Sequence, residues 1–123
     1  MKMEPIQKRV LLVEPYEDSG EMLALLLKHL GHAVRRVRNG RQALATVRAV
    51  APDIVFTELV MPDMCGVALC TALRALPAMR ASRIVALSGY CLARRMPELQ
   101  SAGFDAFLLK PACVETLMEA LAA

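Results

Sequence analysis

The chain has 123 residues, of which 56% are hydrophobic and 22% charged, a length and composition that suit one compact domain and exclude general disorder. Lysine and arginine total 15 against 12 acidic residues, so the formal net charge is only +3. The basic residues are scattered and only 4% of residues are aromatic, which gives no indication of a direct nucleic-acid-binding surface.

Short apolar runs alternate along the chain with segments of helical period. The first run, Val10 to Val13, predicts a strand. A helix follows, for which Asp18 or Ser19 is the expected N-cap and Gly31 the expected stop. The residues expected on its inner face are Met22, Leu23, Leu26, Leu27 and Leu30.

A weaker second strand is predicted over residues 33–37, and Asn39-Gly40 then turns the chain into a helix. The inner face of this helix is expected to carry Leu44, Val47 and either Val50 or Ala51. The third run, Ile54 to Thr57, is continuously β-branched and aromatic, a pattern typical of a strand buried on both faces. We therefore expect it at the centre of a sheet.

The rest of the chain continues the alternation. The expected elements are a helix with Leu69, Leu73 and Leu76 on its inner face, a strand over 84–87, a helix over 96–102 stopped by Gly103, a strand over 106–109, and a helix with Val114, Leu117, Met118 and Leu121 inward. Five strand–helix units predict an α/β fold, a doubly wound parallel sheet that forms a single domain over residues 1–123.

Ligands of doubly wound sheets bind at the carboxyl ends of the strands, so the residues that follow each strand are candidates for a site. These residues are Glu14, Pro15, Glu17, Asp18, Glu58, Ser88 and Lys110. Acids, a hydroxyl and a lysine at one edge suit a phosphoryl group or a metal ion. A solvated rim of loops and helix caps is the other interpretation, and spacing alone leaves both open.

The longest apolar run, Met22 to Leu27, is far too short to span a membrane, and no signal-type segment precedes it. The cysteines lack the spacing of zinc or thioredoxin-like sites and are expected to be free thiols in a reducing compartment; they are Cys65, Cys70, Cys91 and Cys113. We expect a cytoplasmic protein that does not bind membranes.

Four segments carry a family resemblance, in order and at matching spacing: residues 10–14, 52–66, 84–90 and 103–111. They resemble the receiver domain of two-component response regulators, and are most similar to receivers at the C-terminus of hybrid histidine kinases. The resemblance covers essentially the whole chain. It implies a flavodoxin-like (βα)5 fold with strand order 2-1-3-4-5.

In that family, a histidine kinase passes a phosphoryl group to an aspartate at the end of the third strand. Two acids after the first strand hold a magnesium ion, together with the acceptor and a carbonyl two residues beyond it. The resemblance implies that Ser88 and Lys110 are the phosphoryl contacts, Phe107 the switch aromatic, Val60 the carbonyl donor, and Pro111 the residue after a cis peptide bond.

Three positions depart from the family pattern. The acceptor position holds Glu58, the acid pair is Glu14-Pro15, and Phe107 lacks a hydroxyl. Pro15 offers no side-chain oxygen to magnesium, which needs near-ideal octahedral oxygen geometry. The extra methylene of Glu58 misplaces its carboxylate, and an error of about 1 Å in such a site can cost about a hundredfold in rate. Glu17 or Asp18 could supply a substitute ligand, although both are also explained by the start of the helix.

We therefore expect an atypical receiver, a pseudo-receiver with no enzymatic activity and no bound cofactor, which works by protein–protein interaction. In it, Glu58 is expected to form an ion pair with Lys110 without any phosphate. The alternative is a working, magnesium-dependent phosphoacceptor in a phosphorelay. A third interpretation, a flavodoxin-like binder of a small ligand, is disfavoured because the sequence has no Gly-rich phosphate loop. The expected partners are signalling proteins such as a histidine kinase or an output protein, acting through the fourth helix, fifth strand and fifth helix. A homodimer is left open.

Overall fold

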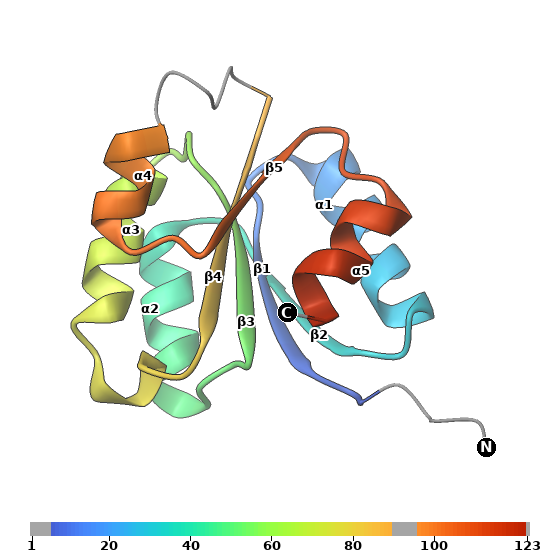
Figure 1. The fold of residues 1–123 in the computed structure, drawn as a ribbon, viewed down its shortest axis with the longest axis horizontal. Helices are drawn as coiled ribbons and strands as arrows, with labels where there is room; N and C mark the ends of the chain where they lie inside the picture. The colour runs from blue at the N-terminus through green and yellow to red at the C-terminus, as the bar shows by residue number, and fades with distance from the viewer. Residues whose placement is uncertain (1–5, 90–95, 123) are drawn as a thin grey trace.

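The apolar runs form the strands of one parallel sheet. The computed structural model describes residues 6–89 and 96–122, in which five strands alternate with five α-helices (Figure 1). The strands are β1 Arg9–Val13, β2 Ala33–Val37, β3 Ile54–Glu58, β4 Arg83–Ser88 and β5 Ala106–Leu109. The helices are α1 Glu17–His29, α2 Gly40–Ala49, α3 Gly66–Arg74, α4 Met96–Ala102 and α5 Val114–Ala122, with a 3-10 turn, η1, at Pro77–Met79. The strand order β2-β1-β3-β4-β5 confirms the predicted doubly wound, flavodoxin-like fold.

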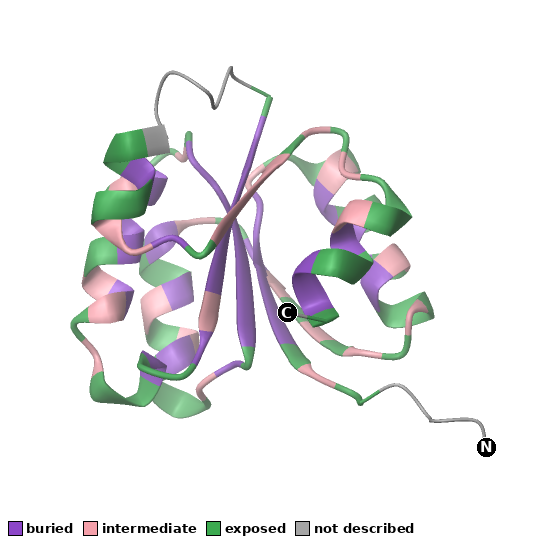
Figure 2. Cartoon of the chain, viewed as in Figure 1, coloured by how far each residue is buried: buried purple, intermediate pink, exposed green. Residues whose placement is uncertain are grey.

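The sheet separates two hydrophobic layers. Every residue of β3 is buried, as its continuous apolar run predicts, and Phe56 lies in register between Leu12 of β1 and Val85 of β4. α1 and α5 cover one face of the sheet, while α2, α3 and α4 cover the other. Figure 2 shows the buried residues concentrated in the central strands and on the inner sides of the helices.

The predicted turn residues perform the expected roles. The Asn39 side chain caps α2 by accepting a hydrogen bond of 2.9 Å from the Gln42 backbone N–H. Gly31 and Gly103 follow α1 and α4 with φ angles of 98° and 107°, in the left-handed region that favours glycine. The sequence therefore specifies these helix boundaries locally.

The predicted N-cap of α1 is wrong. The N-cap is Tyr16, without a side-chain cap, while Asp18 lies in the first helical turn. The buried Glu14 carboxylate explains the earlier start, because it accepts hydrogen bonds from the Tyr16 backbone N–H and from the Ser19 hydroxyl, both at 3.2 Å. An acid from the preceding loop thus bonds the start of the helix in place of a local capping side chain.

Three residues expected on inner helix faces are instead exposed. Met22 is 70% exposed, because α1 buries Gly20, Leu23, Ala24 and Leu27 on its opposite side. Val114 and Met118 of α5 are 37% and 53% exposed, and Ala43 and Ala120 take inward positions in α2 and α5. Of the two alternatives after α2, Val50 is exposed and Ala51 packs against the core. The inner faces of these helices therefore include small residues that hydropathy alone does not select. No helix in the described part of the chain is long and apolar enough to cross a membrane.

Cys70 provides a test of this packing. It lies fully buried in α3, and burial raises the pKa of its thiol to about 11. At pH 8 we expect iodoacetamide to modify the exposed Cys65 and Cys113 in the native protein and to modify Cys70 only after unfolding. Peptide mass mapping over time measures this, and native labelling of Cys70 at the rate of Cys65 would show that α3 does not pack as described.

Candidate functional site

Four of the predicted site residues lie at the carboxyl edge of the sheet. Glu14 follows β1, Glu58 ends β3, Ser88 ends β4, and Lys110 follows β5. The first three are buried, with Glu58 only 3% exposed. Because the strands are parallel, their carboxyl ends bring these residues to one place, and the predicted convergence is confirmed.

Lys110 connects two strands through its ammonium group. Its Nζ lies 2.5 Å from Glu58 Oε2, and it also donates to Glu14 Oε1. The ring of Tyr16 lies beside the same ammonium, with its centroid 5.3 Å from Nζ. The predicted Glu58–Lys110 ion pair is confirmed, and the participation of Glu14 was not predicted.

The electrostatics of the site favour the charged lysine. Burial disfavours a charge on Lys110, but hydrogen bonds to Glu14 and Glu58 and the attraction of their charges outweigh it. The pKa of Lys110 is therefore raised above its ordinary value.

The longer side chain of Glu58 also folds back onto its own backbone. Its Oε1 accepts hydrogen bonds from the backbone N–H groups of Leu59 at 3.0 Å and Val60 at 3.2 Å. Its Oε2 pairs with Lys110. Both carboxylate oxygens of Glu58 are thus engaged by donors of this chain.

The other predicted site residues lie on β4, on β5 and directly after β5. The Lys110 backbone N–H donates to the Ser88 carbonyl at 3.0 Å, and the Lys110–Pro111 bond is cis, as the resemblance implies. Phe107 is half-buried on β5, its ring centroid 6.4 Å from that of Phe104.

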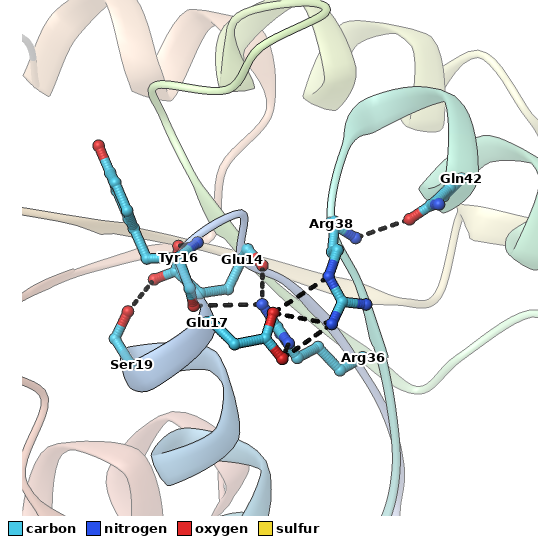
Figure 3. Close-up of polar contacts among 7 residues, drawn as sticks. All are labelled: Glu14, Tyr16, Glu17, Ser19, Arg36, Arg38 and Gln42. Atoms are coloured by element: carbon cyan, nitrogen blue, oxygen red, sulfur yellow. Dashed lines mark hydrogen bonds and ion pairs between the residues drawn. The ribbon is translucent and has the colours of Figure 1, made fainter.

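The contacts of Glu17 and Asp18, the two candidates for a substitute metal ligand, do not support that role. Glu17 binds Arg38 in a bidentate pair, with Nη2 2.8 Å from both carboxylate oxygens, and it also pairs with Arg36 (Figure 3). The hydrogen bond from Arg38 is the main cause of the lowered pKa of Glu17. Asp18 is exposed in the first turn of α1. The structure therefore engages Glu17 with Arg36 of β2 and with Arg38, which directly follows β2.

The residues present do not fit a magnesium ion. The Lys110 ammonium lies against both remaining carboxylates, and Pro15 contributes no side-chain oxygen. Over residues 6–89 and 96–122, no group of three or more His, Cys, Asp or Glu side chains is placed to hold a metal. Magnesium requires a cluster of oxygen ligands with well-defined geometry. The cation in this cluster is the lysine itself.

The sequence matches the response regulator receiver domain family over residues 10–122. The chain belongs to this family. Among curated relatives, the DNA-binding response regulator MtrA of Mycobacterium tuberculosis is 36% identical over 73 residues, 59% of this chain and 32% of that protein. The gliding motility regulatory protein of Myxococcus xanthus is 31% identical over 114 residues, 92% of this chain and 15% of that protein. The receiver thus spans less than a third of the length of these relatives.

Solved receivers share its architecture. A CheY-like receiver domain from Methylobacillus flagellatus is 34% identical, with a TM-score of 0.87 and coverage of 95% of this chain and 98% of that one. The receiver of sensor histidine kinase PA1611 from Pseudomonas aeruginosa, with magnesium in its active-site cleft, is 25% identical, with a TM-score of 0.85 and coverage of 94% and 95%. Receivers are signalling modules that interact with histidine kinases and output domains.

Two residues near the site were missed by sequence reasoning. Tyr16 lies over the Lys110 ammonium, and Arg36 of β2 binds the β1–α1 loop. Arg35 and Arg36 are adjacent in an edge strand, so the strand's alternation alone does not show which one turns inward. The signal available in the sequence was an arginine on the strand next to β1, and it does not distinguish Arg36 from Arg35.

The two ion pairs of the Lys110 ammonium, with Glu14 and with Glu58, are called the Lys110 bridge below. This bridge predicts how stability depends on Lys110. Replacing Lys110 by Met leaves two buried carboxylates without their shared cation, and we expect the free energy of unfolding to fall by about 3–5 kcal/mol. Urea denaturation at pH 7 measures this, with the exposed Lys28→Met as the matched control. Adding Glu58→Gln to Lys110→Met should recover part of the loss, because one uncompensated charge is removed.

The pH dependence of that loss has a definite sign. Because the folded-state pKa of Lys110 lies above its ordinary value of 10.5, its ion pairs stabilise the fold fully below that pH. Their contribution is lost as the pH rises through the folded-state pKa. The stability gap between wild type and Lys110→Met should therefore stay constant from about pH 7 to 9 and narrow above about pH 10.5. A gap that widens in alkali would contradict the bridge.

Proposed function

We propose that this receiver is not phosphorylated by the magnesium-dependent route and signals by binding another protein. The observation that carries the proposal is the single Lys110 ammonium held between the Glu14 and Glu58 carboxylates. The position of the phosphoryl acceptor is filled by an ion pair that needs neither phosphate nor metal.

The chemistry of phosphoryl transfer supports this proposal. Such reactions depend on positioning and on stabilisation of the developing charge, both of which a metal ion normally supplies. Here the Glu58 oxygens are engaged by Lys110 and by two backbone N–H groups. Glu58 carries one charge against about −1.5 to −2 for a phosphoryl group, so it imitates that group only partly.

The partner surface that we propose is formed by α4, β5 and α5. β5 is an edge strand of the sheet, and Leu109, directly before Lys110, is 60% exposed. In this proposal, Ser88 and Lys110 occupy the positions of the phosphoryl contacts and Phe107 that of the switch aromatic. The partner is a signalling protein, such as a histidine kinase or an output protein. The receiver turns over no substrate and does not bind nucleic acid directly.

A second candidate is a working phosphoacceptor. The magnesium-bound receiver of PA1611, which shares the fold, favours it. For this function, Lys110 must release both carboxylates and Glu58 must become the nucleophile. Direct phosphorylation separates the two candidates.

We expect the intact mass to stay unchanged after incubation with magnesium and a small-molecule phosphodonor. The physical reason is that Pro15 removes one metal ligand while the Glu58 oxygens are misplaced and already bonded. Intact mass spectrometry measures the outcome, and a receiver with an aspartate acceptor, treated in parallel, shows that the donor is active. A stoichiometric gain of one phosphoryl group that maps to Glu58 would overturn the proposal.

Reversion tests whether the defect is local. Glu58→Asp alone should restore the acceptor geometry but leave too few carboxylates for the ion, and Pro15→Asp alone should leave the oversized Glu58 in its place. Because both residues act on one ion, the double variant should bind magnesium and accept phosphate more than the sum of the singles. Magnesium titration and phosphodonor labelling measure this, with the exposed Asp18→Asn as a control. If the folded double variant does neither, the defect lies beyond these two residues.

A further inference from the structure

Arg36 reaches from β2 into the loop that carries Glu14. Its Nη2 donates to the Glu14 carbonyl at 2.8 Å and to the Tyr16 carbonyl at 3.1 Å (Figure 3). The side chain is only 11% exposed, and its Nη1 lies 3.3 Å from Glu17 Oε1. One guanidinium therefore hydrogen-bonds the loop backbone on both sides of Pro15.

The loop so held carries one end of the Lys110 bridge. The Glu14 backbone N–H also bonds the Val37 carbonyl of β2 at 3.0 Å, so both backbone polar groups of Glu14 are fixed by β2. Because the backbone of Glu14 is fixed, its side chain can place the carboxylate against Lys110 only within a narrow range of positions. A shift of the loop would change that ion pair first.

Gly20 makes room for the guanidinium. A Cβ atom at Gly20 would lie 2.1 Å from Arg36 Nε and 2.4 Å from Cζ, closer than any real contact. Gly20 lies inside α1, where glycine costs about 1 kcal/mol relative to alanine. A glycine at this helical position is explained by the arginine that packs over it.

The guanidinium is also buried at a cost. Arg36 Nε is buried without a hydrogen-bond partner among the described atoms, because it faces Gly20. Arg38, by contrast, is half-exposed; its side chain binds the Glu17 carboxylate on the outside of the loop, and its backbone N–H donates to Gln42 Oε1. Arg36 of β2 and Arg38, which directly follows β2, therefore have different roles, and of the two only the Arg36 side chain bonds the loop backbone.

We propose that Arg36 is a positioning residue that acts through the backbone of the β1–α1 loop to hold Glu14 against Lys110, and that Gly20 provides the space it needs. The proposal rests on the proposed function, in which the Lys110 bridge fills the phosphoryl site.

The test is the pKa of Lys110 in Arg36→Ala. If Arg36 acted only as a nearby positive charge, its removal would raise the pKa of Lys110. Loss of positioning weakens the Glu14 contact and should lower it, by about half a pH unit or more. A carbon-13 NMR titration of the lysine Cε resonances measures the pKa, and assignment is simple because the lysines are only four, at positions 2, 8, 28 and 110.

Two further variants separate geometry from charge. Gly20→Ala keeps every charge but displaces the guanidinium, so it should also lower the pKa of Lys110, and it should have no further effect when Arg36 is already Ala. Arg36→Lys keeps the charge without the planar fork and should give an intermediate value. The controls are Arg35→Ala, on the exposed neighbouring position of β2, and Arg38→Ala, which should leave Lys110 unchanged.

An unchanged or raised pKa of Lys110 in folded Arg36→Ala or Gly20→Ala would overturn the proposal. Should Arg36→Ala fail to fold, Gly20→Ala and Arg36→Lys decide the outcome alone. Phosphodonor labelling remains a separate readout. A phosphoryl group on Glu58 would refute the proposed function and leave the dependence of Lys110 on Arg36 intact.

Discussion

The shared ammonium of Lys110 is the constraint on which the carboxyl edge of this receiver depends. Burying two carboxylates is costly unless a cation and further hydrogen bonds compensate them. In the strand order β1-β3-β4-β5, β4 separates Lys110, which follows β5, from Glu58 on β3. Glu14, which follows β1, is one strand farther away. Only a long, flexible side chain reaches both acids from there. The geometry of the sheet therefore favours lysine at this position, with its compact charge on a four-carbon stem.

A receiver whose site is filled by an internal ion pair signals differently from one that is phosphorylated. In a receiver controlled by phosphorylation, a carboxylate with one negative charge becomes a group that carries about −1.5 to −2. In the proposed function, the charge around Lys110 is constant, so binding of a partner is set by one fixed arrangement of β5 and its neighbours. Regulation then comes from the presence or affinity of the partner. The exposed Leu109 beside Lys110 links the site directly to that surface.

Much of the fold could be predicted because its signals are local. The unbroken run of β3 specifies a central strand, and Asn39, Gly31 and Gly103 specify helix boundaries. The Glu58–Lys110 pair was predictable because parallel strands bring their carboxyl ends together. Long-range contacts were not: the two arginines of the edge strand β2 look alike in sequence. The same holds for α1, where Met22 and Leu23 are equally apolar and only packing against the sheet selects Leu23.

Pro15 is best understood through charge. A second acid at this position would add a third negative charge to those of Glu14 and Glu58. One lysine cannot balance three carboxylates, so a divalent cation would then be needed. With Pro15, the two carboxylates face Lys110, and the guanidinium of Arg36 lies on the neighbouring carbonyls. The local charge is close to neutral without any metal, which lowers the cost of burying these groups. In the proposed function, a proline at position 15 therefore both withholds a metal ligand and removes the electrostatic need for the metal.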